Sequence, residues 1–170
     1  LRRTGELRTG IDMPQHTIRE LRGELDRRMA ALRGPVKIVV FGCAHGADLE
    51  VDLGPGGTAL RLICTAMLPP SFIEYALRAG ADGVLISGCR YGDCQYRLGN
   101  QWTEERLSGK REPRLRAAVP LQLVRIVWAG PTDQAVLVSE LERFRKDVAA
   151  TPASVRASLA PLRDKEAEGA

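Results

Sequence analysis

The sequence predicts a small three-layer α/β domain of the flavodoxin-like or Rossmann-like class, with a mainly parallel sheet of about four strands. Four short apolar runs, rich in β-branched residues and closed by Gly or Cys in most cases, have the composition of buried parallel strands. These runs are residues 36–41, 60–63, 83–87 and 124–128. Helix signals lie between several of them, and the spacing is typical of βαβ crossovers.

The helices are predicted from apolar residues that recur at spacings of three and four. The first runs from Thr17 to Leu32, and Gly34-Pro35 ends it. Further helices are expected over 71–79, from about residue 100 and between Asp133 and Thr151. In the last helix the side chains expected to face inward are Ala135, Val138, Leu141 and Phe144.

Length and composition indicate one globular domain, because the chain has 170 residues of which 44% are hydrophobic and 27% charged. We divide it into a linker and N-terminal amphipathic helix (1–35), an α/β domain (36–150) and a charged C-terminal tail (151–170). Aromatic residues make up only 5% of the chain. The net charge is +4, and the basic residues that produce it are interleaved with acidic residues. We therefore expect no nucleic-acid partner.

The compartment predicted from the sequence is the cytoplasm. No apolar stretch is long enough to span a bilayer, and no export signal is visible. Because the chain starts at Leu1 rather than Met, we expect it to be part of a longer protein. In a reducing cytoplasm, four cysteines are expected to be ligands or redox groups rather than structural disulfides.

The four cysteines follow the predicted strands. Cys43, Cys64 and Cys89 each come at the end of one of the first three runs, and Cys94 follows Cys89 by five residues. The carboxyl ends of parallel strands meet at one edge of the sheet, so we expect these side chains to converge. Four thiolates around one point form a metal or iron–sulfur site.

The loop that carries the last two cysteines is rich in residues that could surround such a site. Glycines permit tight turns and let backbone N–H groups approach sulfur, arginines bring positive charge, and tyrosines can exclude water. The residues expected around the site are Gly88, Arg90, Tyr91, Gly92, Tyr96, Arg97 and Gly99, together with His45 from the first strand end.

Three other interpretations of the cysteines remain open. A four-cysteine zinc site would serve a structural or adaptor protein, although zinc favours cysteine pairs closer in sequence than Cys43 and Cys64. Cysteine also fills cores as a free thiol, so the same adaptor could hold no metal. Lastly, Cys43 with His45 could form a thiol enzyme; the Cys-x-x-Cys of thioredoxin-type proteins is absent.

Residues 81–100, ADGVLISGCRYGDCQYRLGN, resemble the signature of the delta subunit of methyl-viologen-reducing hydrogenase, and the resemblance extends to CAHGAD at 43–48 and, less specifically, over 36–150. It implies one [2Fe-2S] cluster held by Cys43, Cys64, Cys89 and Cys94. It also implies an electron relay, without an active site of its own. The relay would link the flavoprotein subunit of a heterodisulfide-reductase-type complex to a hydrogenase or formate dehydrogenase subunit.

The chain departs from the family pattern at three positions. The family often has an earlier cysteine at the first strand, where this chain has Val40. The histidines that follow the two later cysteines in the family are replaced by Arg90 and Gln95. Four cysteines still suffice for an all-cysteine cluster, and the replacements remove any Rieske-like histidine ligand there.

Overall fold

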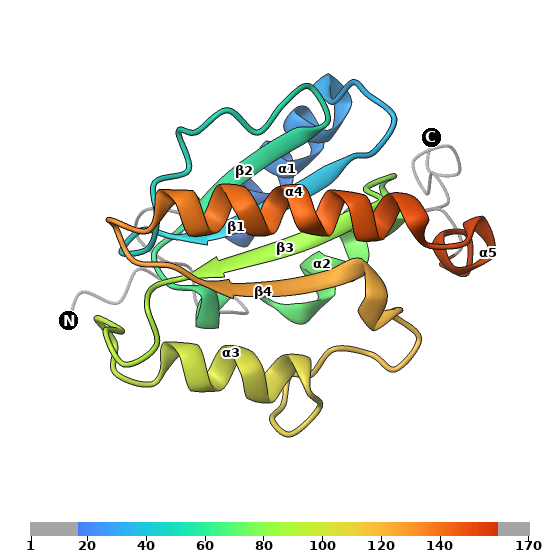
Figure 1. Cartoon of the computed structure of the whole chain (residues 1–170). Helices are drawn as coiled ribbons and strands as arrows, with labels where there is room; N and C mark the ends of the chain where they lie inside the picture. The colour runs from blue at the N-terminus through green and yellow to red at the C-terminus, as the bar shows by residue number, and fades with distance from the viewer. Residues whose placement is uncertain (1–16, 160–170) are drawn as a thin grey trace.

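The computed structural model describes residues 17–159, which fold around a four-stranded sheet in the order β2–β1–β3–β4 (Figure 1). Its strands are β1 (Ile38–Cys43), β2 (Gly57–Leu62), β3 (Gly83–Gly88) and β4 (Val124–Trp128). Every pair is parallel, and Phe41 in the centre of β1 lies opposite Leu60 on one side and Ile86 on the other. The predicted three-layer α/β fold with a parallel sheet is confirmed.

Burial explains why these residues form strands. All residues of β1 and β3 are buried, as expected for central strands covered on both faces, whereas most of the edge strand β4 is only half-buried. The second strand begins earlier than predicted, at Gly57, because Ile38 pairs with Gly57 and its N–H donates to the Gly56 carbonyl at 2.8 Å.

Helices cover both faces of the sheet. They are α1 (Ile18–Ala31), α2 (Pro70–Arg78), α3 (Gly99–Leu107), α4 (Gln134–Ala150) and α5 (Ala153–Arg156), with short 3₁₀ turns η1 (Thr65–Met67) and η2 (Leu121–Leu123). One buried cluster joins α1 and α2 to one face, and a second joins α4 to the other. Figure 1 shows α3 beside β4, away from α4. The helices therefore lie on the faces of the sheet, and the carboxyl ends of its parallel strands lie together at one edge.

The expected alternation of strands and helices fails between β1 and β2, where residues 44–56 contain no helix. This segment instead packs the side chains of Ala47, Leu49 and Leu53 against the core under α4. The helix that contacts β2 is α1, which precedes β1 in the chain. This connection without a helix therefore begins immediately after Cys43, at the carboxyl edge of the sheet.

The two long helices use their apolar faces against the protein's own sheet. In α1, Leu21, Leu25 and Met29 are buried, whereas Ile18 is 47% exposed. A capping box between Thr17 and Glu20 starts this helix. In α4 the buried residues are Leu137, Leu141, Phe144 and Val148. The expectation that Ala135 faces inward is wrong, because it lies on the exposed side of the first turn.

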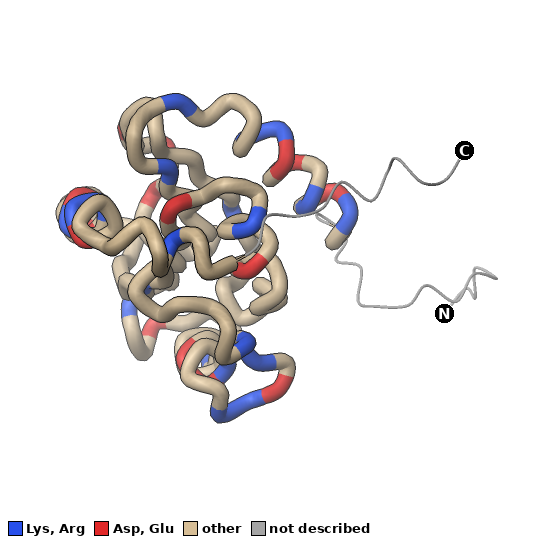
Figure 2. Tube along the Cα trace, turned by 90° about the vertical axis from the view of Figure 1, so that its right-hand side faces the viewer, with Lys and Arg blue, Asp and Glu red and all other residues tan. Residues whose placement is uncertain are grey.

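Figure 2 shows Lys and Arg positions interspersed with Asp and Glu positions along the Cα trace of the described residues. Many arginines pair with carboxylates, for example Arg125 with Asp147 at 2.7 Å and Arg156 with Asp82 at 3.3 Å. Within residues 17–159, no helix has the length and apolar character needed to cross a membrane. The predicted linker residues before 17 and the tail residues after 159 lie outside the described part.

Candidate functional site

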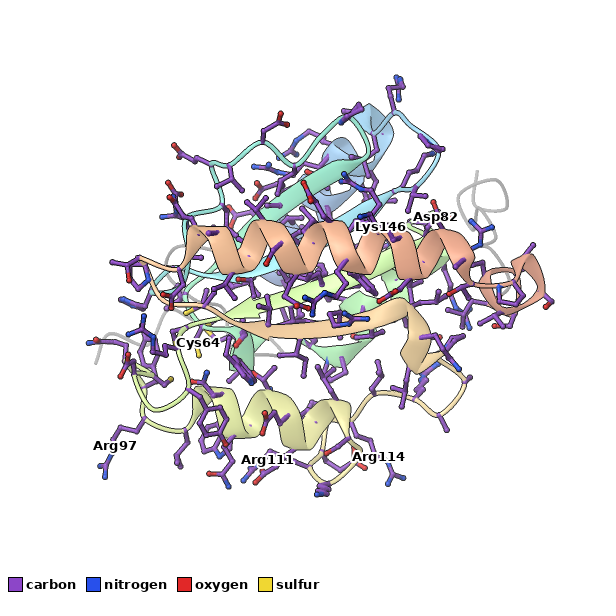
Figure 3. The ribbon with its side chains drawn as sticks, in the orientation of Figure 1. Cys64, Asp82, Arg97, Arg111, Arg114 and Lys146 are labelled. Atoms are coloured by element: carbon purple, nitrogen blue, oxygen red, sulfur yellow. The ribbon has the colours of Figure 1, made fainter. Side chains whose placement is uncertain are left out.

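The four cysteines come together at the carboxyl edge of the sheet. Cys43 ends β1, Cys64 follows β2 and precedes η1, Cys89 follows β3, and Cys94 lies in the loop before α3. All four are free thiols; the first three are each 4% exposed, and Cys94 is half-buried. Figure 3 shows the sulfur atoms grouped around the labelled Cys64. The structure thus places the predicted donor atoms in one cluster.

Cys43 and Cys64 lie close enough to shift each other's pKa. Against the effect of burial, the neighbouring Cys64 thiol lowers the pKa of Cys43 well below its ordinary value. The Cys43 side chain, together with burial, raises the pKa of Cys64. The backbone N–H of His45 donates to Cys43 Sγ at 3.4 Å, and the backbone N–H of Ala66 faces Cys64. Such amide donors stabilise negative sulfur.

Cys89 lies in a different environment. Burial and the neighbouring charge of Cys43 raise the pKa of the Cys89 thiol. Its main polar neighbour is Asn100, the second residue of α3, which is 4% exposed. The Asn100 side chain donates from Nδ2 to the Cys89 carbonyl at 2.7 Å and accepts from Cys89 Sγ at 3.5 Å. Asn100 is therefore a site residue that the sequence did not single out, although it ends the GCRYGDCQYRLGN stretch.

Gly99 brings the start of α3 against two of the sulfurs. A Cβ atom added to Gly99 would lie 2.5 Å from Cys64 Sγ and 2.7 Å from Cys94 Sγ, closer than a carbon atom can approach sulfur without displacing it. Only glycine therefore fits between these two thiols.

The same helix is fastened to the turn that carries Cys64. The hydroxyl of Thr103 lies 3.0 Å from that of Thr65, and both residues are buried. The Arg106 guanidinium donates to the Ala66 carbonyl. Thr103 lies one turn after Asn100, and Arg106 lies one turn after Thr103, so each neighbouring pair is close on the surface of α3. This spacing is the signal that could have identified them as residues supporting the site.

Several of the residues predicted to surround the sulfurs pack against neighbouring aromatic rings. The exposed His45 ring packs edge-on against Tyr96, with centroids 6.1 Å apart, and Tyr91 packs similarly on Trp128 at 5.9 Å. Gly88 is buried against the Trp128 ring, which a Cβ at that position would strike. These contacts place the two tyrosines at the exposed rim of the site.

The two loop arginines do not point at the sulfurs. The Arg90 guanidinium is engaged by Asp133, at 2.8 Å from Nη2 to Oδ1. Figure 3 shows Arg97 extending away from the molecule. Arg97 adopts a positive φ of 70°, and Gly92 one of 94°, so the loop around Cys94 turns tightly. The Arg90 charge is therefore engaged by a carboxylate and not by sulfur.

An apolar groove opens beside Cys64. It has a volume of about 490 Å³, and its lining includes Cys64, Gly99, Ile18, Met67, Tyr96 and Trp102. We call the three exposed apolar side chains on this groove, Ile18, Met67 and Tyr96, the apolar rim. The candidate site is thus covered by protein on the sheet side and bordered by exposed apolar surface on the other.

The donor set fits an iron–sulfur cluster in its chemistry. It consists of four thiols, backbone N–H groups directed at two of them, and a glycine packed against the sulfurs of Cys64 and Cys94. Within residues 17–159, no group of three or more His, Cys, Asp or Glu side chains is arranged so that it could hold a metal ion. Cys43 Sγ instead donates to the Ile63 carbonyl at 3.7 Å, and Cys89 Sγ donates to Asn100 Oδ1 at 3.5 Å.

Val40, which replaces a cysteine often found in the family, has no access to this site. It is fully buried in the cluster under α4, three residues before Cys43. Alternation along β1 places Val40 on the α4 face, whereas Val39 and Phe41 face α1 and α2. A ligand at position 40 would therefore require a different local structure.

Comparison with known proteins agrees with the resemblance. The family described as "Methyl-viologen-reducing hydrogenase, delta subunit" matches residues 38–151. The iron-sulfur subunit of the F420-non-reducing hydrogenase vhc of Methanococcus voltae is 39% identical over 79 residues, which are 42% of this chain and 55% of that protein. The iron-sulfur subunit of the F420-non-reducing hydrogenase of Archaeoglobus profundus is 34% identical over 97 residues, 57% of this chain and 71% of that protein.

A second kind of relative is much longer. It is a subunit of the ferredoxin:CoB-CoM heterodisulfide reductase of Methanosarcina mazei, and it is 29% identical over 89 residues. These residues are 52% of this chain but only 11% of that protein. The similarity is thus confined to a small segment of the reductase protein.

Proposed function

This chain belongs to the delta-subunit family of methyl-viologen-reducing hydrogenase, and from that premise we propose that it is an electron-transfer subunit with one [2Fe-2S] cluster. The ligands are Cys43, Cys64, Cys89 and Cys94. The observation that carries the proposal is the convergence of four free thiols from three adjacent strand ends and the following loop. The protein performs no bond-making chemistry of its own.

When bound, the cluster would supply a centre that accepts and returns one electron. The chain's own residues provide its ligands and surroundings. Backbone N–H groups at His45 and Ala66 stabilise negative charge on Cys43 and Cys64. Burial of three thiols excludes water, and Gly99 allows α3 to approach the sulfurs closely.

The electron partners follow from the relatives. We propose a hydrogenase- or formate-dehydrogenase-type module on one side and a heterodisulfide-reductase-like flavoprotein on the other. The hydrogenase relatives are named as iron-sulfur subunits, which supports the first partner. A related segment forms part of a much longer heterodisulfide reductase chain. A domain that is covalently joined to a protein in one organism is expected to dock on its counterpart where the two are separate, which supports the second.

The test is anaerobic purification of the full chain, followed by iron, sulfide and zinc quantitation and a visible spectrum. We expect about two irons and two sulfides per chain, with a visible absorption that bleaches on reduction by dithionite. Replacing Cys89 by Ser should lower the iron content and change the spectrum. A colourless protein with about one zinc per chain would instead identify a structural zinc protein.

A further inference from the structure

We propose that Asn100 is a positioning residue that holds Cys89 in place and lowers the reduction potential of the cluster. This inference rests on the proposed function, since it concerns the environment of one of the four proposed ligands. It assigns a role to a buried polar side chain whose two hydrogen bonds both go to the same cysteine.

The orientation of the Asn100 amide is fixed by the Cys89 backbone. The Cys89 carbonyl is an acceptor only, so the group that lies 2.7 Å from it must be the Asn100 NH₂ group. The amide oxygen is thereby turned toward Cys89 Sγ, at 3.5 Å. Reversing the amide would bring two carbonyl oxygens together in a buried place, which is unfavourable.

Contacts made by neighbouring residues of α3 also fix the position of the Asn100 amide. Asn100 follows Gly99, where an added Cβ would lie only 2.5 Å from Cys64 Sγ and 2.7 Å from Cys94 Sγ. One turn later, Thr103 contacts Thr65 and donates to the Gly99 carbonyl at 2.8 Å. The helix cannot move away from Cys89 without breaking these contacts, so the position of Asn100 is set by the site as a whole.

The electrostatic consequence follows from the sign of the facing atom. A thiolate ligand has no proton to donate, so the Asn100 oxygen presents the negative end of its dipole to negative sulfur. Reduction adds further negative charge to the cluster and its ligands, and burial keeps solvent from screening the repulsion. Asn100 therefore disfavours the reduced state, whereas the N–H groups that face Cys43 and Cys64 favour it.

The test compares wild type with Asn100→Ala and Asn100→Leu in the full chain. Leucine nearly preserves the side-chain volume, so it removes the amide without leaving a large cavity. Gln101→Ala and Gln101→Leu are the matched controls, because Gln101 is the next residue of α3, is exposed and bonds through its side chain to Glu105. The readouts are the potential from a redox titration followed by electron paramagnetic resonance, and the rate of iron loss to a chelator.

Both Asn100 variants are expected to show a more positive potential and a several-fold faster loss of iron, with both Gln101 variants close to wild type. Variants that fold by circular dichroism but retain no cluster would also support the positioning role. An unchanged or more negative potential in Asn100 variants that retain the cluster would overturn this inference but not the proposed function. Unfolding of both Asn100 variants would also overturn it, by showing that Asn100 serves stability only. A wild-type protein without iron and sulfide would instead overturn the proposed function, and this inference with it.

Discussion

Arg90 and Asp133 form an ion pair in which two guanidinium nitrogens contact the same carboxylate, at 3.1 and 2.8 Å. The pair joins the loop that follows Cys89 to the turn between β4 and α4. The Gly130 N–H donates to the same carboxylate at 2.8 Å. The positive charge that was expected beside the sulfurs is thus used to hold the Cys89 loop to the neighbouring strand end.

This pair predicts an acid transition. The Gly130 N–H, followed by Arg90, holds the pKa of Asp133 below its usual value of 3.8. A lowered pKa in the folded state means that the interaction stabilises the protein above pH 3.8 and is lost as the pH falls through the folded value. Titration of the Asp133 carboxyl by NMR should therefore give a midpoint below 3.8.

Removing the arginine should shift this midpoint only in part. In Arg90→Ala the pKa of Asp133 should rise but stay below 3.8, because the Gly130 N–H, the largest cause, remains. Arg90→Lys keeps the charge but not the forked geometry. In this variant the pKa of Asp133 should lie between the values in wild type and in Arg90→Ala. A wild-type midpoint at or above 3.8 would show that the pair does not persist in solution.

Gly99→Ala should impair cluster binding more than folding. The backbone of Gly99 is helical and accepts alanine, but the new Cβ would have to displace Cys64 Sγ or Cys94 Sγ. We expect at least a several-fold drop in iron per chain with a circular dichroism spectrum like that of wild type. Gly23→Ala in α1 is the control, since its Cβ would meet only Arg27, at 3.6 Å. It should retain iron and gain roughly 0.5–1 kcal/mol of stability.

The paired hydroxyls of Thr65 and Thr103 predict a non-additive mutant cycle. Thr103→Val leaves the Thr65 hydroxyl, which is 3% exposed, without its partner and should cost about 1–3 kcal/mol in the free energy of unfolding. Thr65→Val should cost less, because Thr103 still donates to the Gly99 carbonyl. The double variant should be less destabilised than the sum of the two, as measured by urea denaturation.

Equal and additive losses would contradict this account. They would mean that the two hydroxyls do not share a hydrogen bond and that α3 is held to η1 mainly by Arg106. The iron content of each variant should be measured alongside, because Cys64 directly precedes η1.

The strands and the convergence of their ends were predictable because both follow from short-range patterns. Buried apolar runs identify β1 and β3, and parallel strands place Cys43 and Cys89 at one edge whatever the details of the helices. The absence of a helix between β1 and β2 was not predictable in this way. It depends on α1, which precedes β1 yet occupies the place over β2 that a crossover helix would take.

The role of α3 was missed for a related reason. Asn100 and Arg106 are polar residues on a helix of low amphipathicity, and their importance comes from partners distant in sequence, Cys89 and Ala66. Arg90 illustrates the converse, since its proximity to Cys89 in sequence suggested an electrostatic role at the sulfurs, whereas its side chain pairs with Asp133. Spacing within a segment predicts a shared face, but it does not identify the partner across the fold.

The apolar rim predicts a surface used by the electron partner. Ile18, Met67 and Tyr96 are 47%, 37% and 53% exposed beside the groove that contains Cys64. Electron transfer requires a short distance, so the proposed heterodisulfide-reductase-like flavoprotein should cover this side of the site. Exposed apolar residues near the centre of an interface contribute most to binding, and each change to Ser should weaken association about tenfold, roughly 1.4 kcal/mol.

The measurement is the affinity of Ile18→Ser, Met67→Ser and Tyr96→Ser for that flavoprotein, with iron content as a check on the site. The controls are Leu121→Ser and Val136→Ser, because these residues are 64% and 44% exposed but do not line the groove. Equal weakening by rim and control variants would indicate a general effect of lost apolar surface. Weakening by the controls alone would place the partner elsewhere, and electron transfer would then need a path that does not pass Cys64.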